Sequence, residues 1–193
     1  MNDLQEQLDR SESRNRLNNL VAVSVALISV FMAVTKVKDD NIVQTMLQAK
    51  SDAVDTWNEY QSKKIKQHLA EIGLNQARVL LAIPQSKDGG ELSLQQKNYQ
   101  ESIARYQKEA VGLSVKAKEL EKRYDDLNFR DDQFDLSDAV LSISMAMLAI
   151  TSLTSNRSLF AVALFFAFFG IIMGIAGLFG LPLHPSALIQ MLS

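Results

Sequence analysis

The sequence predicts an all-α membrane protein with three transmembrane helices and a long antiparallel helical hairpin, a coiled coil, between the first and the second. Three observations predict this fold. Apolar residues gather in three runs, at residues 17–35, 136–155 and 159–181, while nearly all charges lie in residues 1–16 and 36–138. Apolar side chains recur at alternating steps of four and three over residues 99–127, which is typical of a coiled-coil helix. A proline and a glycine pair interrupt the charged stretch near its middle.

The first and third apolar runs have the length and composition of membrane spans. Residues 17–35 carry no charge, and at about 1.5 Å per residue a helix of this length covers roughly the 30 Å hydrocarbon core. Lys36 and Lys38 follow without a small-residue cleavage site, so we expect a retained anchor and not a cleaved signal. Residues 159–181 are the most apolar, and Pro182 follows them. Residues 1–16 then form a charged N-terminal segment and residues 182–193 a short C-terminal tail.

The second run, residues 136–155, is less apolar and contains several Ser and Thr residues. Asp138 lies near its start and is the candidate intramembrane polar site, since an ionisable group within a span is a functional hypothesis by default. Its position within the first turn favours an interfacial or capping role over a proton or ion pathway. Only residues 156–158 separate this run from the third, which predicts a tight transmembrane hairpin.

Residues 36–135 are expected to form the extramembrane helical hairpin, with its turn at residues 84–93. Pro84 ends the first arm, Gly89 and Gly90 form the turn, and Ser93 with Gln96 has the spacing of a capping box at the start of the second arm. Neither junction with the apolar runs contains Pro or Gly, so we expect each arm to continue directly into a span.

The apolar stripes of the two arms predict the residues that face each other. The second arm has a regular stripe at Tyr99, Ile103, Tyr106, Ala110, Leu113, Ala117, Leu120, Tyr124 and Leu127. The first arm has a less regular one at Ile42, Met46, Ala49, Ala53, Trp57 and Tyr60, continued by Ile65, Leu69, Ile72, Val79 and Ile83. Heptad stripes of this kind bury their apolar side chains against a partner helix.

Small residues form a further stripe in the third run. Ala163, Ala167, Gly170, Gly174 and Gly177 recur at steps of four and three. Small side chains let another helix approach closely. The stripe therefore predicts helix packing or oligomerisation, and its partner is another span of the same chain, the same span of a second copy, or a different protein.

Residues 57–66 read WNEYQSKKIK and resemble the Trp-x-x-Tyr-Gln-(Ala/Ser)-Lys-x-Ile-Lys pattern of a bacterial membrane family described as domain of unknown function 4337. The order of spans and helical arms is similar over nearly the whole chain. The resemblance implies a bacterial inner-membrane protein and brings no activity, so no catalytic residue carries over. Lys63, Lys64 and Lys66 are either surface contacts for an acidic partner or part of the packing within the hairpin.

Composition and motifs argue against several classes of function. The chain has no cysteine, which excludes disulfides and thiolate sites, and a net charge of −2 lacks the basic surface expected for binding nucleic acid. His68 and His184 are too far apart in the sequence to suggest a metal site. No phosphate-binding loop, nucleophile elbow or dinucleotide fingerprint is present. We therefore expect no enzyme activity, catalytic residue, metal or cofactor.

The distribution of positive charge bears on orientation. Arg10, Arg14, Arg16 and Arg157 lie on one side of a three-span arrangement, which favours that side as cytoplasmic and the hairpin as periplasmic. Lysines and arginines near the membrane on the hairpin side argue the other way, but long loops cross largely regardless of charge.

The leading hypothesis from the sequence is a non-catalytic, self-associating membrane scaffold or accessory protein built on a coiled-coil stalk. Its expected partners are the lipid bilayer, further copies of itself or another membrane protein. An alternative is an oligomeric channel or conduit in which Ser137, Asp138, Ser144 and Thr151 face a shared pore. A third is a small subunit of a larger membrane complex.

Overall fold

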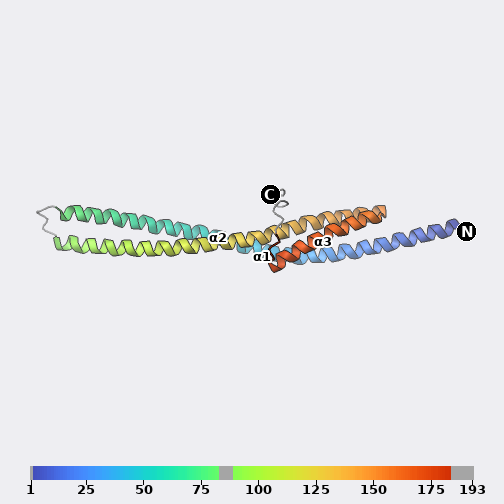
Figure 1. The fold of residues 1–193 in the computed structure, drawn as a ribbon, viewed down its shortest axis with the longest axis horizontal. Helices are drawn as coiled ribbons and strands as arrows, with labels where there is room; N and C mark the ends of the chain where they lie inside the picture. The colour runs from blue at the N-terminus through green and yellow to red at the C-terminus, as the bar shows by residue number, and fades with distance from the viewer. Residues whose placement is uncertain (1, 83–88, 184–193) are drawn as a thin grey trace. The chain divides into compact units, whose positions relative to one another are not determined.

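The computed structural model describes residues 2–82 and 89–183, and all regular structure in these residues is helical (Figure 1). The helices are α1 (Asn2–Leu81), α2 (Gly89–Thr154) and α3 (Arg157–Phe179). Each contains a stretch long and apolar enough to cross a membrane. The fold is therefore all-α with three candidate spans, as the sequence predicts.

The helices continue through both junctions at which the apolar and charged stretches meet. α1 is unbroken between residues 35 and 36, and α2 is unbroken between residues 135 and 136. Neither junction offers a proline, which would remove a backbone donor, or a glycine, which would weaken the helix.

The start of α2 corrects one prediction. Gly89 and Gly90 form the start of helix α2 and do not belong to the loop between the two arms. Ser93 is already inside the helix and does not begin it. Glu91 lies in the first turn of α2, where its carboxylate complements the partial positive charge of the free N–H groups. This favours a helix start upstream of Glu91. Ile83 and Pro84 lie outside the described residues.

The chain divides into two compact units, which are described separately. The apolar unit comprises Met1–Thr45 and Asp126–Ser193, and the charged unit comprises Met46–Asp125. The apolar unit contains all of α3 and one part of each longer helix, and the charged unit contains the remaining parts of α1 and α2.

The core of the apolar unit is small and lies among its three helices. Its cluster of buried residues consists of Val21 and Ile28 from α1, Leu141 and Leu148 from α2, and Ala163 and Ala167 from α3. Many of the largest apolar side chains point outward instead, among them Leu20, Leu27, Val30, Phe165, Phe168 and Phe179. In a water-soluble protein, large apolar side chains such as these are favoured inside the core and not on the surface.

The link between α2 and α3 is very short. Ser155 has a φ of 54°, in the left-handed region, and turns the chain after α2. Asn156 is the N-cap of α3, because its side-chain oxygen accepts hydrogen bonds from the backbone N–H groups of Ser158 and Leu159. α3 therefore begins at Arg157, two residues before the predicted start of the third apolar run.

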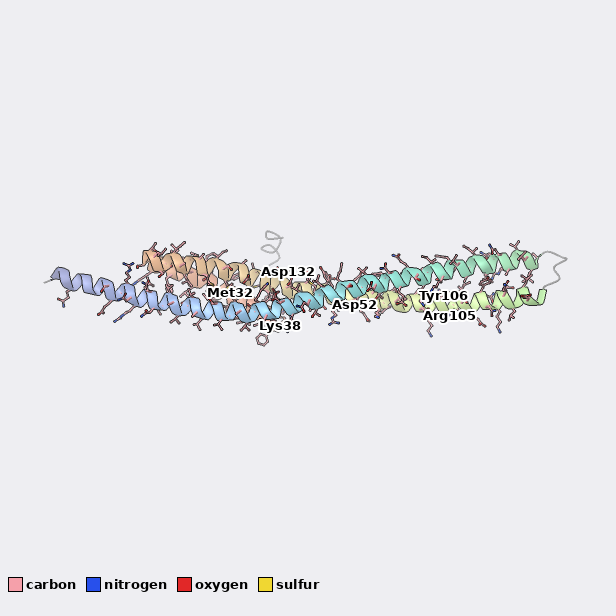
Figure 2. The ribbon with its side chains drawn as sticks, turned by 180° about the vertical axis from the view of Figure 1, so that it is seen from behind. Met32, Lys38, Asp52, Arg105, Tyr106 and Asp132 are labelled. Carbon is pink, nitrogen blue, oxygen red and sulfur yellow. The ribbon has the colours of Figure 1, made fainter. Side chains whose placement is uncertain are left out.

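In the charged unit, segments of α1 and α2 run antiparallel. Residues further along α1 contact residues earlier in α2: Trp57 Nε1 donates to Glu121 over 2.8 Å, and Lys63 Nζ lies 2.7 Å from Glu109. Figure 2 shows the side chains along both helices, including Arg105 beside Tyr106 on α2. The residues of the predicted α2 stripe, from Tyr99 to Leu127, are all buried or half-buried.

The face that α1 turns inward differs from the predicted one beyond Tyr60. Ile65, Leu69, Ile72 and Val79 are each more than half exposed, so the predicted continuation of the stripe through them is wrong. α1 keeps the steps of three and four set by its first part. Its inward residues are Met46, Ala49, Ala53, Thr56, Tyr60, Lys63, Gln67, Ala70, Leu74 and Ala77.

Gly73 on α1 accommodates the large ring of Tyr99 on α2. A Cβ atom at Gly73 would lie 2.6 Å from Cζ of Tyr99, so only a glycine allows this ring its position. Alternation of small and large residues across facing positions is how such a layer packs without voids. This pairing depends on the volumes of the facing side chains, and the spacing of apolar residues in the sequence does not reveal it.

Candidate functional site

The small-residue stripe of α3 packs within the chain. Ala163, Ala167, Gly170, Gly174 and Gly177 are all buried in the apolar unit. A Cβ atom at Gly170 would lie 2.7 Å from Leu141, and one at Gly174 would lie 2.7 Å from Phe31. α2 and α1 therefore occupy the approach that these small residues open, which is the intramolecular alternative among the three that the sequence leaves open.

Hydroxyl groups of α2 bind the backbone of α3 along the same contact. Ser137 donates to the carbonyl of Gly170 over 2.8 Å, and Ser144 donates to that of Ala163 over 2.7 Å. Thr151 is equally buried but donates within α2, to the carbonyl of Met147. All three hydroxyls are buried within the chain. Asp138 points to the exposed side of α2 instead.

A group of polar side chains lies where α3 ends, and we call Lys36, Asp39, Arg130, Asp131 and Gln133 the polar layer. Two of them bind the C-terminus of α3, whose last carbonyls have no partner within the helix. The Arg130 guanidinium donates to the carbonyls of Gly177 and Leu178, at distances from 2.9 to 3.2 Å.

Gln133, whose side chain is fully buried, binds the residues that follow α3. Its amide nitrogen donates to the carbonyls of Leu181 and Leu183, over 2.8 and 2.6 Å. Together with the positive charge of Arg130, which complements the negative end of the helix dipole, it fixes α2 against the end of α3.

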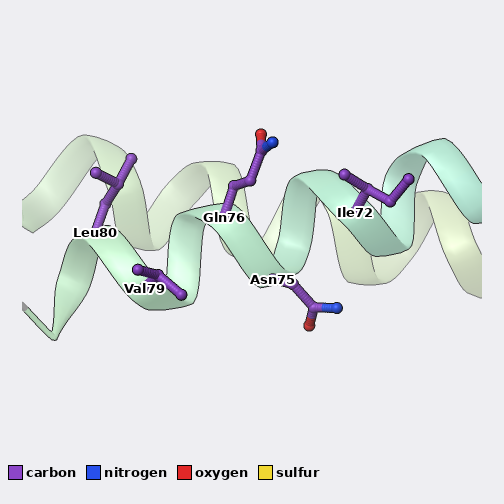
Figure 3. Close-up of a pocket in the computed structure, with 5 residues that line it drawn as sticks. All are labelled: Ile72, Asn75, Gln76, Val79 and Leu80. Atoms are coloured by element: carbon purple, nitrogen blue, oxygen red, sulfur yellow. The ribbon is translucent and has the colours of Figure 1, made fainter.

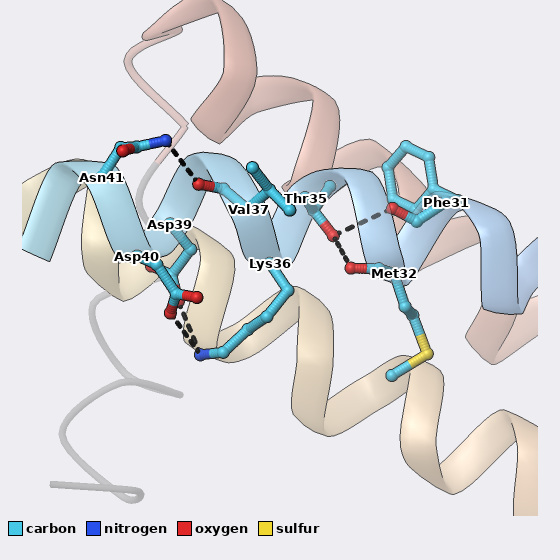
Figure 4. Close-up of polar contacts among 8 residues, drawn as sticks. All are labelled: Phe31, Met32, Thr35, Lys36, Val37, Asp39, Asp40 and Asn41. Carbon is cyan, nitrogen blue, oxygen red and sulfur yellow. Dashed lines mark hydrogen bonds and ion pairs between the residues drawn. The ribbon is translucent and has the colours of Figure 1, made fainter.

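The acidic members of the polar layer face each other from α1 and α2. Asp39 is only 4% exposed, and its carboxylate accepts a hydrogen bond of 2.9 Å from Lys36 (Figure 4). Burial, a hydrogen bond to Asp39 and the charge of Asp135 raise the pKa of Asp131 to about 7. The raised pKa means that Asp131 keeps its proton to a higher pH than an ordinary aspartate does, which reduces the repulsion between two acids that lie together with one nearby lysine.

In the charged unit the aromatic and ionic contacts concentrate around Trp57. Its ring meets that of Tyr60 edge to face, with centroids 5.3 Å apart. One turn further along, the hydrogen bond between Lys63 and Glu109 raises the pKa of the lysine and lowers that of the carboxyl group. The Trp57–Glu121 and Lys63–Glu109 contacts join the two antiparallel segments.

The described residues contain no cluster suited to a metal ion. No group of three or more His, Cys, Asp or Glu side chains among them has the arrangement to hold a metal ion. His68 contacts Glu71 on its own helix, over 3.0 Å, and His184 lies outside the described residues. Among the polar side chains named above, Arg130, Gln133, Ser137 and Ser144 bind backbone carbonyls of α3 or just beyond it, and they thereby fix α2 against that part of the chain.

A family model described as domain of unknown function (DUF4337) matches residues 17–180, which is most of the chain. The chain belongs to the DUF4337 family. This confirms the resemblance that residues 57–66 indicate. No curated protein and no solved structure matches the chain.

The residues that carry the DUF4337 resemblance divide between two faces of α1. Trp57, Tyr60 and Lys63 turn toward α2, where they make the contacts described above. Ile65 and Lys66 are exposed on the outer surface. One short motif therefore contributes both to the packing inside the charged unit and to its surface.

Sequence reasoning missed the polar layer. Arg130 and Gln133 look like ordinary residues of a charged helix, because the carbonyls they bind lie about fifty residues away in the sequence. One signal was available: Gln133 is an uncharged polar residue one turn before the apolar run that starts at residue 136.

Proposed function

We propose that this chain is a non-catalytic scaffold or accessory protein of the bacterial inner membrane, that its charged unit is a coiled-coil hairpin, and that copies of it self-associate. The observation that carries the membrane part is the inverted arrangement of the apolar unit. Phe165, Phe168 and Leu27 are exposed there, while Ser137 and Ser144 are buried and hydrogen-bonded. Lipid accepts apolar surface and requires polar groups to be satisfied inside the protein.

The non-catalytic part rests on how the polar side chains are used. Arg130, Gln133, Ser137 and Ser144 all donate to backbone carbonyls of or just beyond α3. Groups engaged in fixing helices are not free to bind or activate a substrate. The apolar unit is thus suited to anchor the chain firmly.

Self-association is supported by the modest core of the charged unit. The inward face of α1 is made largely of small or polar residues, among them Ala49, Ala53, Thr56, Gln67 and Ala70. Helical stability in proteins comes mostly from packing an apolar face, and alanine seams bury little apolar area. Contact with neighbouring hairpins would add burial that the pair does not provide alone.

For orientation we propose a cytoplasmic N-terminus and a periplasmic hairpin. Arg157 donates to the hydroxyl of Ser13, which brings the link between α2 and α3 beside the N-terminal part of α1 that contains its arginines. Arg14 and Arg16 lie within one turn of that contact on α1. Positive residues close to the ends of spans favour the cytoplasmic side.

The test is the mass of the protein extracted in mild detergent, measured by light scattering with the detergent contribution subtracted. We expect a discrete species whose protein mass is a multiple of 21.5 kDa. A monomer at several protein concentrations would contradict self-association. A second protein in fixed ratio would make the chain a subunit of a larger complex instead.

A further inference from the structure

An apolar band runs along the outer side of α1 within the charged unit. Leu47, Val54, Ile65, Leu69, Ile72 and Val79 are each at least half exposed. At 100° per residue these positions fall on one face, roughly opposite the face that packs on α2. Ile72, Gln76 and Leu80 project from one side of the helix near the end of this band (Figure 3).

The same face carries no charged residue over its whole length, and we call it the α1 band. Its members, all exposed, are Leu47, Ser51, Val54, Asn58, Gln61, Ile65, Leu69, Ile72, Gln76 and Val79. They follow steps of four and three with one additional step of four, and at about 1.5 Å per residue they extend over roughly 50 Å. The charged exposed residues of α1 in this unit, Lys50, Asp55, Glu59, Lys66 and Arg78, all lie at positions outside this band.

This spacing calls for a partner helix with a matching stripe, since heptad side chains pack into holes formed by a helix of the same period. Among the described residues of the charged unit, the outer face of α2 does not provide one. Its exposed large apolar residues are Leu94, Val111 and Val115, which are irregularly spaced. The matching surface on this chain is the α1 band itself.

The polar members of the band suit a contact between identical surfaces. Asn58, Gln61 and Gln76 end in amides, which carry both donors and acceptors, so each is complementary to its own copy. A charged residue at such a position would instead repel its symmetry mate, and the band has none. Isologous dimers require this self-complementarity.

We infer that the α1 band is the surface through which two copies of this chain associate, as a parallel coiled coil with Ile72 of one copy facing Ile72 of the other. The inference rests on the proposed function, because two hairpins anchored in one membrane and projecting on the same side present their α1 arms in parallel. A two-fold axis then pairs each band residue with its own copy.

The first experiment uses the chain's lack of cysteine, which makes any introduced thiol unique. Leu69→Cys and Gln76→Cys place it on the band. Arg78→Cys is the matched control, because Arg78 is also exposed on α1 but lies two residues after Gln76, about 200° around the helix from it. In native membranes treated with a short bis-maleimide, we expect both band variants to form a product of twice 21.5 kDa and the control to form at least about tenfold less.

The second experiment tests whether Ile72 of one copy faces Ile72 of the other. Ile72→Lys and Ile72→Glu each place a charge opposite its own copy, and because Ile72 is 55% exposed neither change disturbs the interior of the hairpin. Co-purification of two differently tagged copies should fall about tenfold or more for either variant alone. It should recover when one copy carries Lys and the other Glu. A different partner protein would give no such recovery.

The outcomes separate this inference from the proposed function. Equal cross-linking of the band variants and Arg78→Cys, a cross-linked product containing another protein, or no recovery on mixing Lys and Glu copies would overturn the inference. If light scattering still shows a homo-oligomer in those cases, self-association stands through another surface. A monomer by light scattering together with uncross-linked band variants would refute both.

Discussion

Two glycines of the charged unit should respond in opposite ways to the same substitution. Gly73 and Gly112 both lie inside helices, and replacing either by alanine removes the same backbone freedom from the unfolded chain. A Cβ at Gly112 meets nothing within 4 Å, whereas one at Gly73 would lie 2.6 Å from Cζ and 2.8 Å from Cε1 of Tyr99. The two variants therefore differ only in the contact with the ring.

The expected free energies follow from that difference. Gly112→Ala should stabilise the charged unit by about 0.5–1 kcal/mol, the usual gain for alanine over glycine within a helix. Gly73→Ala has the same gain but must displace the Tyr99 ring, and overpacking of this kind costs about 1–3 kcal/mol. We therefore expect the two variants to differ in unfolding free energy by about 1–3 kcal/mol, with Gly73→Ala the less stable.

The assay is urea unfolding of the full protein in mild detergent, followed by the fluorescence of Trp57. This is the single tryptophan of the chain, and it lies in the charged unit, so the signal reports that unit. In a Tyr99→Val background the ring is absent, and Gly73→Ala should then become stabilising. Equal effects of the two alanine substitutions in the original background would refute the packing of Tyr99 on Gly73.

Three further predictions concern the apolar unit, each measured by thermal unfolding of the detergent-solubilised protein. Because the pKa of Asp131 is raised from 3.8 to about 7, the folded state holds the proton of this carboxyl group more tightly than the unfolded state does. The resulting stability is complete below about pH 4 and is lost as the pH rises through 7. Asp131→Asn should flatten this dependence of the unfolding temperature on pH between about pH 5 and 8. Arg130→Gln removes the charged cap on the Gly177 carbonyl and should cost about 1.5–3 kcal/mol, with faster hydrogen exchange in the last turn of α3; unchanged exchange would contradict the cap. Ser144→Ala removes one bond to the Ala163 carbonyl and should cost only about 0.6 kcal/mol, so a loss of several kcal/mol would show that more depends on this hydroxyl.

The sequence was sufficient to predict the helices of this chain but not all of their faces. The apolar runs are long and nearly free of charge, and only residues 155–156 interrupt helix between the last two. Continuity of α1 and α2 through the junctions followed from the lack of Pro and Gly there. Such features depend on local composition, which a single sequence contains in full.

The inward face of α1 was misassigned because two stripes run along the helix. Ile65, Leu69 and Ile72 are more hydrophobic than Gln67 and Ala70, so hydrophobicity alone selects the outer stripe. On the inner stripe the ring of Tyr99 on α2 instead requires a small residue, Gly73, on α1. That preference depends on volume across the pair, and no property of α1 alone reveals it.

The polar layer escaped prediction for a related reason. Arg130 and Gln133 acquire their role only when the end of α3 lies beside them, and residues near 180 give no sequence signal for such a partner. The raised pKa of Asp131 likewise needs Asp39 from another helix. Contacts between residues far apart in the chain are the part that single-sequence reasoning could not supply.

The short link between α2 and α3 bears on how the chain is made. Asn156 caps the start of α3, and Arg130 and Gln133 of α2 bind the carbonyls at its end. Side chains of α2 and of the link thus satisfy backbone groups at both ends of α3 without a contribution from α1, and a link of two residues cannot carry α3 to a distant position. In a bilayer this pair would enter as one preassembled element. α1 packs on this pair through Phe31, whose ring lies over Gly174.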